Sequence, residues 1–158
     1  MFKLIFLAIL SAMLLIGCSM SNQLQGKNCK IVYYDKGRPT DMIVDSSNAI
    51  IESVTDLVQG ADDRIRLIVT KSTIDKVKQN NCVEFELPEE LRVKMYNGNL
   101  LSFSKILISF NDGRPNAPYV VFYCGKKEYN TPPYINSNGA QIAEEIRKFC
   151  ENMINSKK

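Results

Sequence analysis

The pair Asn97-Gly98 lies between two runs of alternating apolar and polar residues, 91–96 and 100–110. Asparagine and glycine tolerate the positive φ angles that a tight turn between antiparallel strands requires. The pattern therefore predicts a β-hairpin with a type I′ turn at Asn97-Gly98. Strands joined by so short a connection pair antiparallel, which restricts this part of the chain to an antiparallel sheet.

Other short runs with a period of two predict further strands. They are rich in β-branched and aromatic residues, and they are bounded by residues that favour turns. The predicted strands cover residues 30–34, 40–44, 64–70, 82–87 and 119–124, with a short return strand at 127–129. Neighbouring hairpins in the second half of the chain are typical of a β-meander.

Three segments, near 47–59, 72–80 and 139–154, have apolar residues at helical spacing. Ser46-Ser47 offers an N-cap for the first, and Ser72 begins an S-x-x-D pattern for the second. The order of elements predicts an α+β fold, a mainly antiparallel sheet with a β-meander and two to three amphipathic helices packed on one face.

The N-terminus has Lys3 followed by an uncharged apolar run, residues 4–16, that leads to Gly17-Cys18. A membrane-spanning helix needs about 20 apolar residues, so this run is too short to cross a bilayer. Its length is that of a signal-peptide core. An ordinary secretory signal cleaved near Ser19 and a buried N-terminal helix are the alternatives.

The segment Leu15-Ile16-Gly17-Cys18 resembles the lipobox of bacterial lipoproteins, and the polar stretch after it resembles their tether. The resemblance implies cleavage before Cys18 and acylation of that cysteine, with 1–17 as signal peptide. Residues 18–27 would form the lipidated tether and 28–158 a single globular domain. We expect a lipid-anchored protein of the cell envelope. In a Gram-negative cell, Ser19 rather than Asp favours the outer membrane, facing the periplasm or the surface.

The chain contains no histidine, which excludes Ser-His-Asp and Cys-His catalysis and the usual zinc sites. Its net charge is only +3, and no basic stripe of the kind that binds nucleic acid occurs. The glycines are dispersed, so no phosphate-binding loop is present. We expect no cofactor, no metal and no nucleic acid partner.

Four cysteines remain if Cys18 carries lipid: Cys29, Cys82, Cys124 and Cys150. An even number in an oxidising compartment predicts at least one disulfide. Four cysteines allow three pairings, and the sequence does not choose between them. The alternative is four buried free thiols, because cysteine packs as a small hydrophobic residue.

Two pairs of carboxylates are candidates for chemistry. Glu84 and Glu86 share one face of a predicted strand, and Asp62-Asp63 precedes another. The expected role of Glu84 and Glu86 is to line the water-exposed face of a sheet. The expected role of Asp62-Asp63 is to form a solvated turn.

The region 111–138 has the greatest potential for binding, because Pro- and Asn-rich loops there alternate with tyrosines. The candidate contact residues are Arg114, Tyr119 and Tyr134. The sequence thus favours a non-enzymatic binding module, such as an inhibitor, an immunity-type protein or an envelope accessory protein. Its partner is expected among envelope or secreted proteins. The alternative is a carboxylate-dependent enzyme or binder that acts on cell-wall glycans.

Overall fold

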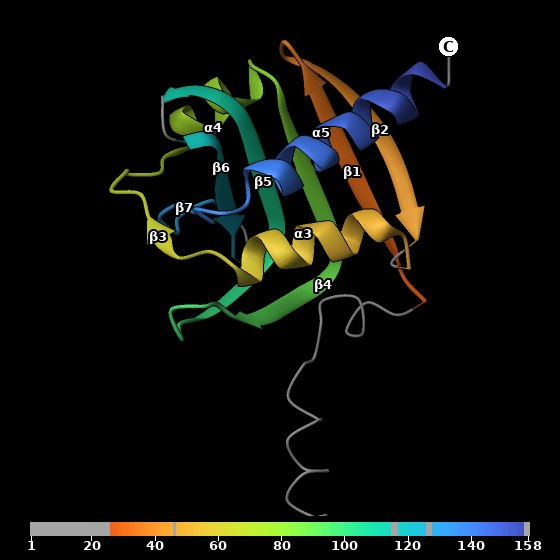
Figure 1. Cartoon of the computed structure of the whole chain (residues 1–158). Coiled ribbons are helices and arrows are strands. Elements are labelled where there is room, and N and C mark those ends of the chain that lie inside the picture. The colour runs from red at the N-terminus through yellow and green to blue at the C-terminus, as the bar shows by residue number, and fades with distance from the viewer. Residues whose placement is uncertain (1–25, 46, 115–116, 126–127, 157–158) are drawn as a thin grey trace, which may run out of the picture.

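The computed structural model describes residues 26–45, 47–114, 117–125 and 128–156, which form one open antiparallel sheet and three helices (Figure 1). The sheet has seven strands in the order β2-β1-β4-β5-β6-β7-β3. Their bounds are β1 Asn28–Asp35, β2 Arg38–Asp45, β3 Asp63–Arg64, β4 Cys82–Lys94, β5 Leu100–Arg114, β6 Ala117–Cys124 and β7 Tyr134–Ile135. Strands β4 to β7 are neighbours in both sequence and sheet. The predicted α+β fold with a β-meander is therefore confirmed.

The predicted hairpin joins β4 to β5, but its turn is not of type I′. Gly98 has φ +82°, whereas Asn97 is not among the residues with positive φ. The N–H of Gly98 donates to the carbonyl of Met95 at 2.9 Å, and the N–H of Met95 donates to the carbonyl of Asn99 at 2.9 Å. This pattern belongs to a three-residue loop, in which the glycine alone supplies the left-handed conformation.

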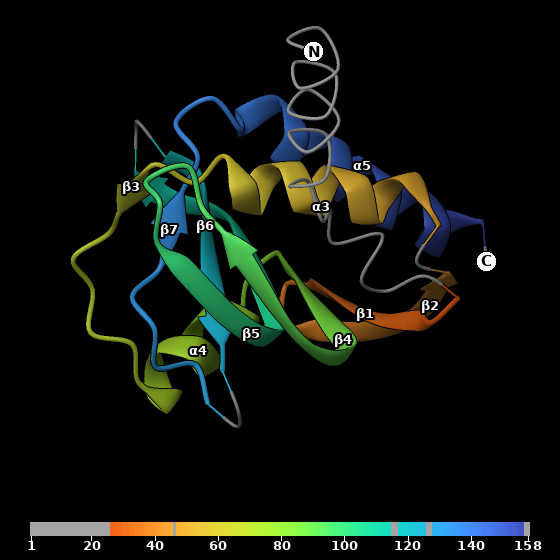
Figure 2. The same ribbon diagram turned by 90° about the horizontal axis from the view of Figure 1, so that it is seen from below.

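Two helices, α3 (Ala49–Gln59) and α5 (Ala140–Asn155), cover one face of the sheet, which we call the two-helix face (Figure 2). The N-cap of α3 is Asn48, whose side chain accepts from the N–H of Ile50. Residues of both helices pack against alternate residues of β1, β4, β5 and β6. This face contains the main core, which includes Ile51, Leu57, Phe85, Phe103, Ile106 and Ile146.

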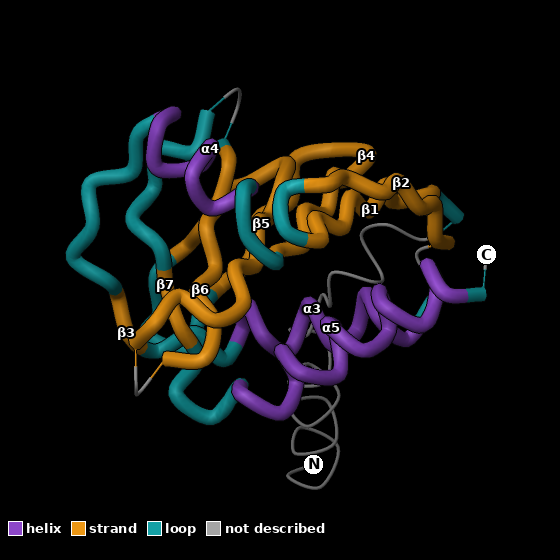
Figure 3. Tube along the Cα trace, turned by 90° about the horizontal axis from the view of Figure 1, so that it is seen from above, coloured by secondary structure: helices purple, strands orange, loops and turns teal. Residues whose placement is uncertain are grey.

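The third helix, α4 (Lys71–Lys78), packs on the opposite face, which we call the α4 face (Figure 3). It starts with a capping box formed by Thr70 and Thr73. Ile74 is its one buried residue, and it joins a smaller apolar cluster with Ile65, Cys82, Leu107, Val120 and Phe122. The two-helix face is therefore closed by two long helices, and the α4 face by one short helix and loops.

Several strand boundaries differ from the prediction. The predicted strand 64–70 pairs only at β3, because the chain beyond Ile65 separates from its neighbour. β7 forms within the segment expected to be a Pro/Asn loop, and the described residues of 127–129 contain no strand. β5 extends to Arg114 and β6 begins at Ala117, so the expected loop 111–118 is mostly strand.

In the structure the four cysteines of the domain are buried free thiols, the alternative that the sequence left open, and none of them forms the predicted disulfide. Cys29 and Cys150 lie in the core of the two-helix face, while Cys82 and Cys124 lie on the α4 face. The sheet separates these two pairs.

Strand order also keeps Cys82 and Cys124 apart. β4 and β6 are separated by β5, and neighbouring strands are about 4.8 Å apart. Cys82 lies opposite Ser109 and Cys124 opposite Lys105, so the two are also offset along the sheet. A disulfide needs Cα atoms within about 7 Å. Burial raises the pKa of the Cys82 thiol to about 12, which keeps it protonated and unreactive near neutral pH.

Candidate binding groove at the sheet edge

Two of the three residues expected to contact a partner are core residues. Tyr119 is 2% exposed and Tyr134 is 7% exposed. The Tyr119 hydroxyl donates to the carbonyl of Asn136 at 2.5 Å and accepts from the N–H of Asn136 at 3.0 Å. Burial raises the pKa of Tyr119 to about 12. Both tyrosines therefore hold the domain together, which corrects the interpretation of them as contact residues. Arg114 ends β5, but its side chain lies outside the described residues.

The loop that follows Tyr134 is also fixed to the domain. A Cβ on Gly139 would collide with the Tyr119 hydroxyl and with the side chain of Leu57. Asp62 accepts from the N–H and the hydroxyl of Ser137, at 2.8 and 3.0 Å. Asp62 is therefore a structural residue that fixes the loop up to Gly139 to the domain, although Ser137 and Asn138 remain exposed.

The carboxylate of Glu84 is buried on the α4 face, where water was expected. Glu84 is only 3% exposed, because α4 and the segment around Tyr129 cover it. Its oxygens accept from the Lys78 ammonium at 2.7 Å and from the Tyr129 hydroxyl at 2.6 Å. The hydroxyl of Tyr34 is more distant, at 3.4 Å. We call these four residues the Glu84 cluster.

The Glu84 cluster changes the acidity of its members. Burial would lower the pKa of Lys78, but the hydrogen bond and the charge of Glu84 outweigh it and raise that pKa. Burial first, and then the charge of Glu84, raise the pKa of Tyr129 well above its usual range. Lys78 therefore stays charged and Tyr129 stays neutral at physiological pH. This is the state in which both donate to the carboxylate.

Glu86 lies two residues further along the same face and is more accessible. It pairs with Lys105 at 2.8 Å, and the two side chains are 31% and 39% exposed. Each carboxylate thus has its own lysine. The two form separate structural ion pairs, and neither lines the two hollows described below.

The segment 65–70 forms an open edge beside the sheet. Ile65, Leu67 and Val69 pack toward the apolar cluster of the α4 face, while Arg64, Arg66 and Ile68 are exposed. The N–H of Ile65 donates to the carbonyl of Pro133 at 2.9 Å, and beyond it no ladder hydrogen bond is formed among the described residues. The side chains alternate in exposure as in a strand, but the backbone of 66–69 forms no ladder with another strand among the described residues. The hydrogen bond from the N–H of Leu67 is local, to the carbonyl of Ile65 at 2.9 Å.

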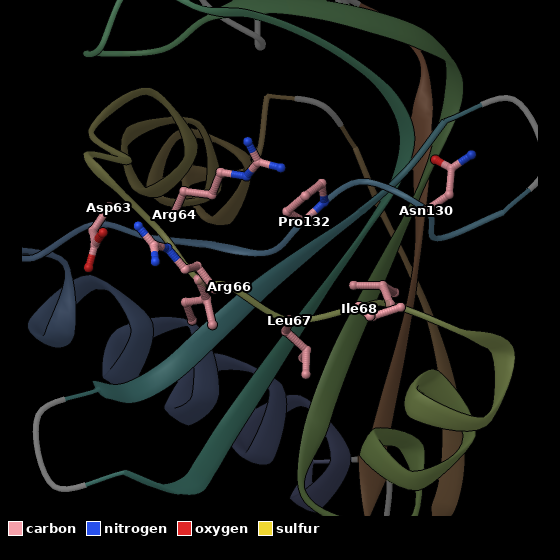
Figure 4. A pocket seen from close by; sticks show the side chains of 9 residues that line it. Asp63, Arg64, Arg66, Leu67, Ile68, Asn130 and Pro132 are labelled. Carbon is pink, nitrogen blue, oxygen red and sulfur yellow. The ribbon is translucent and has the colours of Figure 1, made fainter.

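A hollow of about 860 Å³ opens between this segment and the chain at Asn130 and Pro132 (Figure 4). Asp63, Arg64 and Arg66 lie on one wall (Figure 4), and neither arginine forms an ion pair with the described residues, so the two cations outnumber the one carboxylate. Leu67 and Ile68 supply apolar surface on the same wall. The arrangement suits an anionic ligand with apolar groups, because both features are already in place.

A second hollow of about 390 Å³ continues from the first, since Val69 and Asn130 line both. Its other walls come from the start of α4 and from Glu128 and Tyr129. We call the two hollows together the edge groove. Tyr129 forms part of its wall while its hydroxyl donates to Glu84, so the Glu84 cluster supports this end of the groove.

The sequence contained the signal for the edge groove, in the alternation of arginine and apolar residues at 64–69. That alternation was interpreted as an ordinary strand. The sequence does not show the path of the chain at 130–133, which pairs with this segment only near β3 and leaves residues 66–69 without a neighbouring strand.

Comparison of the chain with protein-family models, with curated proteins and with solved structures finds no match. Within the described ranges, none of the helices has the length and apolar character needed to span a membrane. In the same ranges, no three histidine, cysteine, aspartate or glutamate side chains gather where they could hold a metal ion.

Proposed function

We propose that this chain is a lipid-anchored protein of the cell envelope that acts as a non-enzymatic binding module and captures a protein partner in the edge groove. The observation that carries this proposal is the pair Arg64 and Arg66, unpaired among the described residues, on the wall of an open hollow. A guanidinium that is not used within the fold is available to a carboxylate of another molecule.

The disposition of the carboxylates supports binding over hydrolysis of cell-wall glycans. A glycosidase needs two carboxyl groups that flank the bond to be cleaved. Glu84 is held by Lys78 and Tyr129, and Glu86 is paired with Lys105. Both carboxylates stabilise the α4 face. The lining of the edge groove is mainly apolar, and its three basic residues (Arg64, Arg66 and Lys71) outnumber its two acidic ones (Asp63 and Glu128).

The anchor is the second part of the proposal. Cys18 lies outside the described residues, and its acylation rests on the resemblance of Leu15-Ile16-Gly17-Cys18 to a lipobox. Changing Cys18→Ser should release the protein from membranes and remove the added mass of the acyl chains. Membrane fractionation and intact-mass measurement test this directly. An unmodified mature N-terminus on the native protein would contradict the anchor.

Photo-crosslinking in the native envelope tests the groove. Ile68 is 84% exposed beside the groove, and Ile43 is 69% exposed on β2 at the opposite edge of the sheet. A photoreactive residue at position 68 should yield a specific adduct that the same residue at position 43 does not yield. The adduct should disappear when Arg64 and Arg66 are both changed to glutamate. Equal adducts from both positions would contradict a role for the groove.

A further inference from the structure

The unpaired backbone of the edge groove points to the class of partner. The N–H groups of Arg66, Ile68 and Val69 donate to no other described residue. Residues 65–70 follow β3 directly and belong to no helix or strand, and within the segment the N–H of Leu67 donates to the carbonyl of Ile65 at 2.9 Å. An edge with free donors and acceptors is a template for a further strand. The complement of such an edge is a polypeptide backbone.

We propose that the edge groove accepts an extended acidic segment of a protein partner, which adds as a strand to residues 65–69. This inference rests on the proposed function and specifies the partner. Main-chain hydrogen bonds would supply affinity, and the groove side chains would supply specificity, as in other cases of strand addition. The acceptor carbonyls of the partner would meet the free N–H groups of the segment.

Charge determines which polypeptide fits. Arg64 and Arg66 lie two residues apart in the sequence, and both side chains line the same hollow (Figure 4). Carboxylates on alternate residues of an added strand have the same spacing. Ile68 continues this row and is 84% exposed, so an apolar residue of the partner would cover it. The preferred segment therefore has acidic residues in alternation and an apolar residue at one end.

The opposite edge of the sheet is unsuitable for the same segment. β2 carries Asp41 and Asp45, and Pro39 near its start has no N–H to donate. Acidic side chains there would repel an acidic strand. The two edges thus differ in charge, and only the edge with Arg64 and Arg66 offers unpaired cations together with an unpaired backbone.

Synthetic peptides can test the inference with the chain from Ser19 onward. This chain retains every described core residue, the first of which is Cys29. The probe is the peptide Thr-Glu-Val-Glu-Val-Glu-Val, compared with the same peptide carrying Lys in place of Glu. Binding is measured by fluorescence anisotropy, and the site is mapped from backbone amide NMR shifts. The acidic peptide should bind and shift the amides of 65–69, and the basic peptide should not bind.

Two variants test the charge. R64E/R66E should weaken binding of the acidic peptide by about tenfold or more, because two attractive charges become repulsive. The matched control R38E/K94E reverses two exposed cations away from the groove and should leave affinity unchanged. Circular dichroism of each variant checks the fold. Equal loss in both variants would overturn recognition by the groove.

N-methylation of the peptide tests strand pairing without changing the protein. Methyl groups on alternate backbone amides remove the donors from one edge of the peptide only. Methylation of one set should abolish binding, and methylation of the other set should leave it intact. Equal binding of both methylated peptides would overturn strand addition. If no acidic peptide binds while crosslinking from position 68 still captures a partner, the strand inference fails and the proposed function stands.

Discussion

The two faces of the sheet are stabilised by different kinds of interaction. The two-helix face is an apolar core closed by α3 and α5, with Phe85 and Ile106 fully buried. The α4 face has a smaller apolar cluster, a buried ion pair and the edge groove. The apolar side chains of the two-helix face are covered by α3 and α5 (Figure 2), so they are not available to a partner. On this difference rests the assignment of stability to the two-helix face and, in the proposed function, of recognition to the α4 face.

Truncating one buried side chain in each apolar cluster should give the largest difference between the two faces in the free energy of unfolding. Phe85→Ala removes a fully buried ring from the two-helix face and should lower the free energy of unfolding by about 3–5 kcal/mol. Ile74→Ala on the α4 face should cost no more than about 2 kcal/mol. Helix α4 has eight residues and one buried side chain, so its local undocking limits the loss.

Urea denaturation followed by circular dichroism measures both losses. Hydrogen exchange adds a local test, because Ile74→Ala should speed exchange in α4 and leave the amides of α3 and α5 protected. Equal losses for Phe85→Ala and Ile74→Ala would show that the two faces form one cooperative core. The division between a stabilising face and a recognition face would then be wrong.

The next largest change in the free energy of unfolding should come from breaking the buried ion pair of the α4 face, between Lys78 and Glu84. Glu84→Gln keeps the shape but removes the charge that Lys78 faces, and the side chain of Glu84 is only 4% exposed. We expect a loss of about 2–3 kcal/mol, since a partly buried ammonium is left without its counter-charge. Glu86→Gln is the matched control and should cost less than about 1 kcal/mol, because the pair with Lys105 is well solvated.

Thermal and urea unfolding of both variants measure this difference. Lys78→Met combined with Glu84→Gln should recover part of the loss, because no unpaired charge then remains on the α4 face. Losses of the same size for Glu84→Gln and Glu86→Gln would show that the burial of Glu84 does not make its ion pair more important for stability than the solvated pair of Glu86.

The sequence predicted the elements that depend on local periodicity. Ile50, Ile51, Val54, Leu57 and Val58 follow a helical pattern, and all five are buried on α3. The alternation in 82–87 placed Val83 and Phe85 in the core correctly. These features depend on residues within one element, so the sequence of that element is sufficient.

The sequence did not predict features that depend on two distant segments. Glu84 was expected in water because its neighbours on the strand alternate, but α4 and Tyr129 cover it. Tyr119 was expected on a contact surface, and its hydroxyl instead binds Asn136. Cys82 and Cys124 fail to pair because β5 lies between their strands. In each case, the decisive neighbour comes from strand order and helix placement, which periodicity does not encode.

The smallest changes in the free energy of unfolding should come from removing one tyrosine hydroxyl on each face. The Tyr129 hydroxyl on the α4 face donates to the Glu84 carboxylate, whereas the buried Tyr123 hydroxyl on the two-helix face has no hydrogen-bond partner among the described residues. Tyr129→Phe should cost about 1–2 kcal/mol, because it removes a hydrogen bond to a charged acceptor. Tyr123→Phe should be neutral or slightly stabilising, because it removes a hydroxyl whose burial is not compensated, and the ring still packs edge-on against Tyr134. Urea unfolding of the two variants side by side measures the contrast. A loss of more than about 1 kcal/mol for Tyr123→Phe would show that the Tyr123 hydroxyl adds a polar contact to the two-helix face beside that of Tyr119, and the difference in stability between the two variants would shrink accordingly.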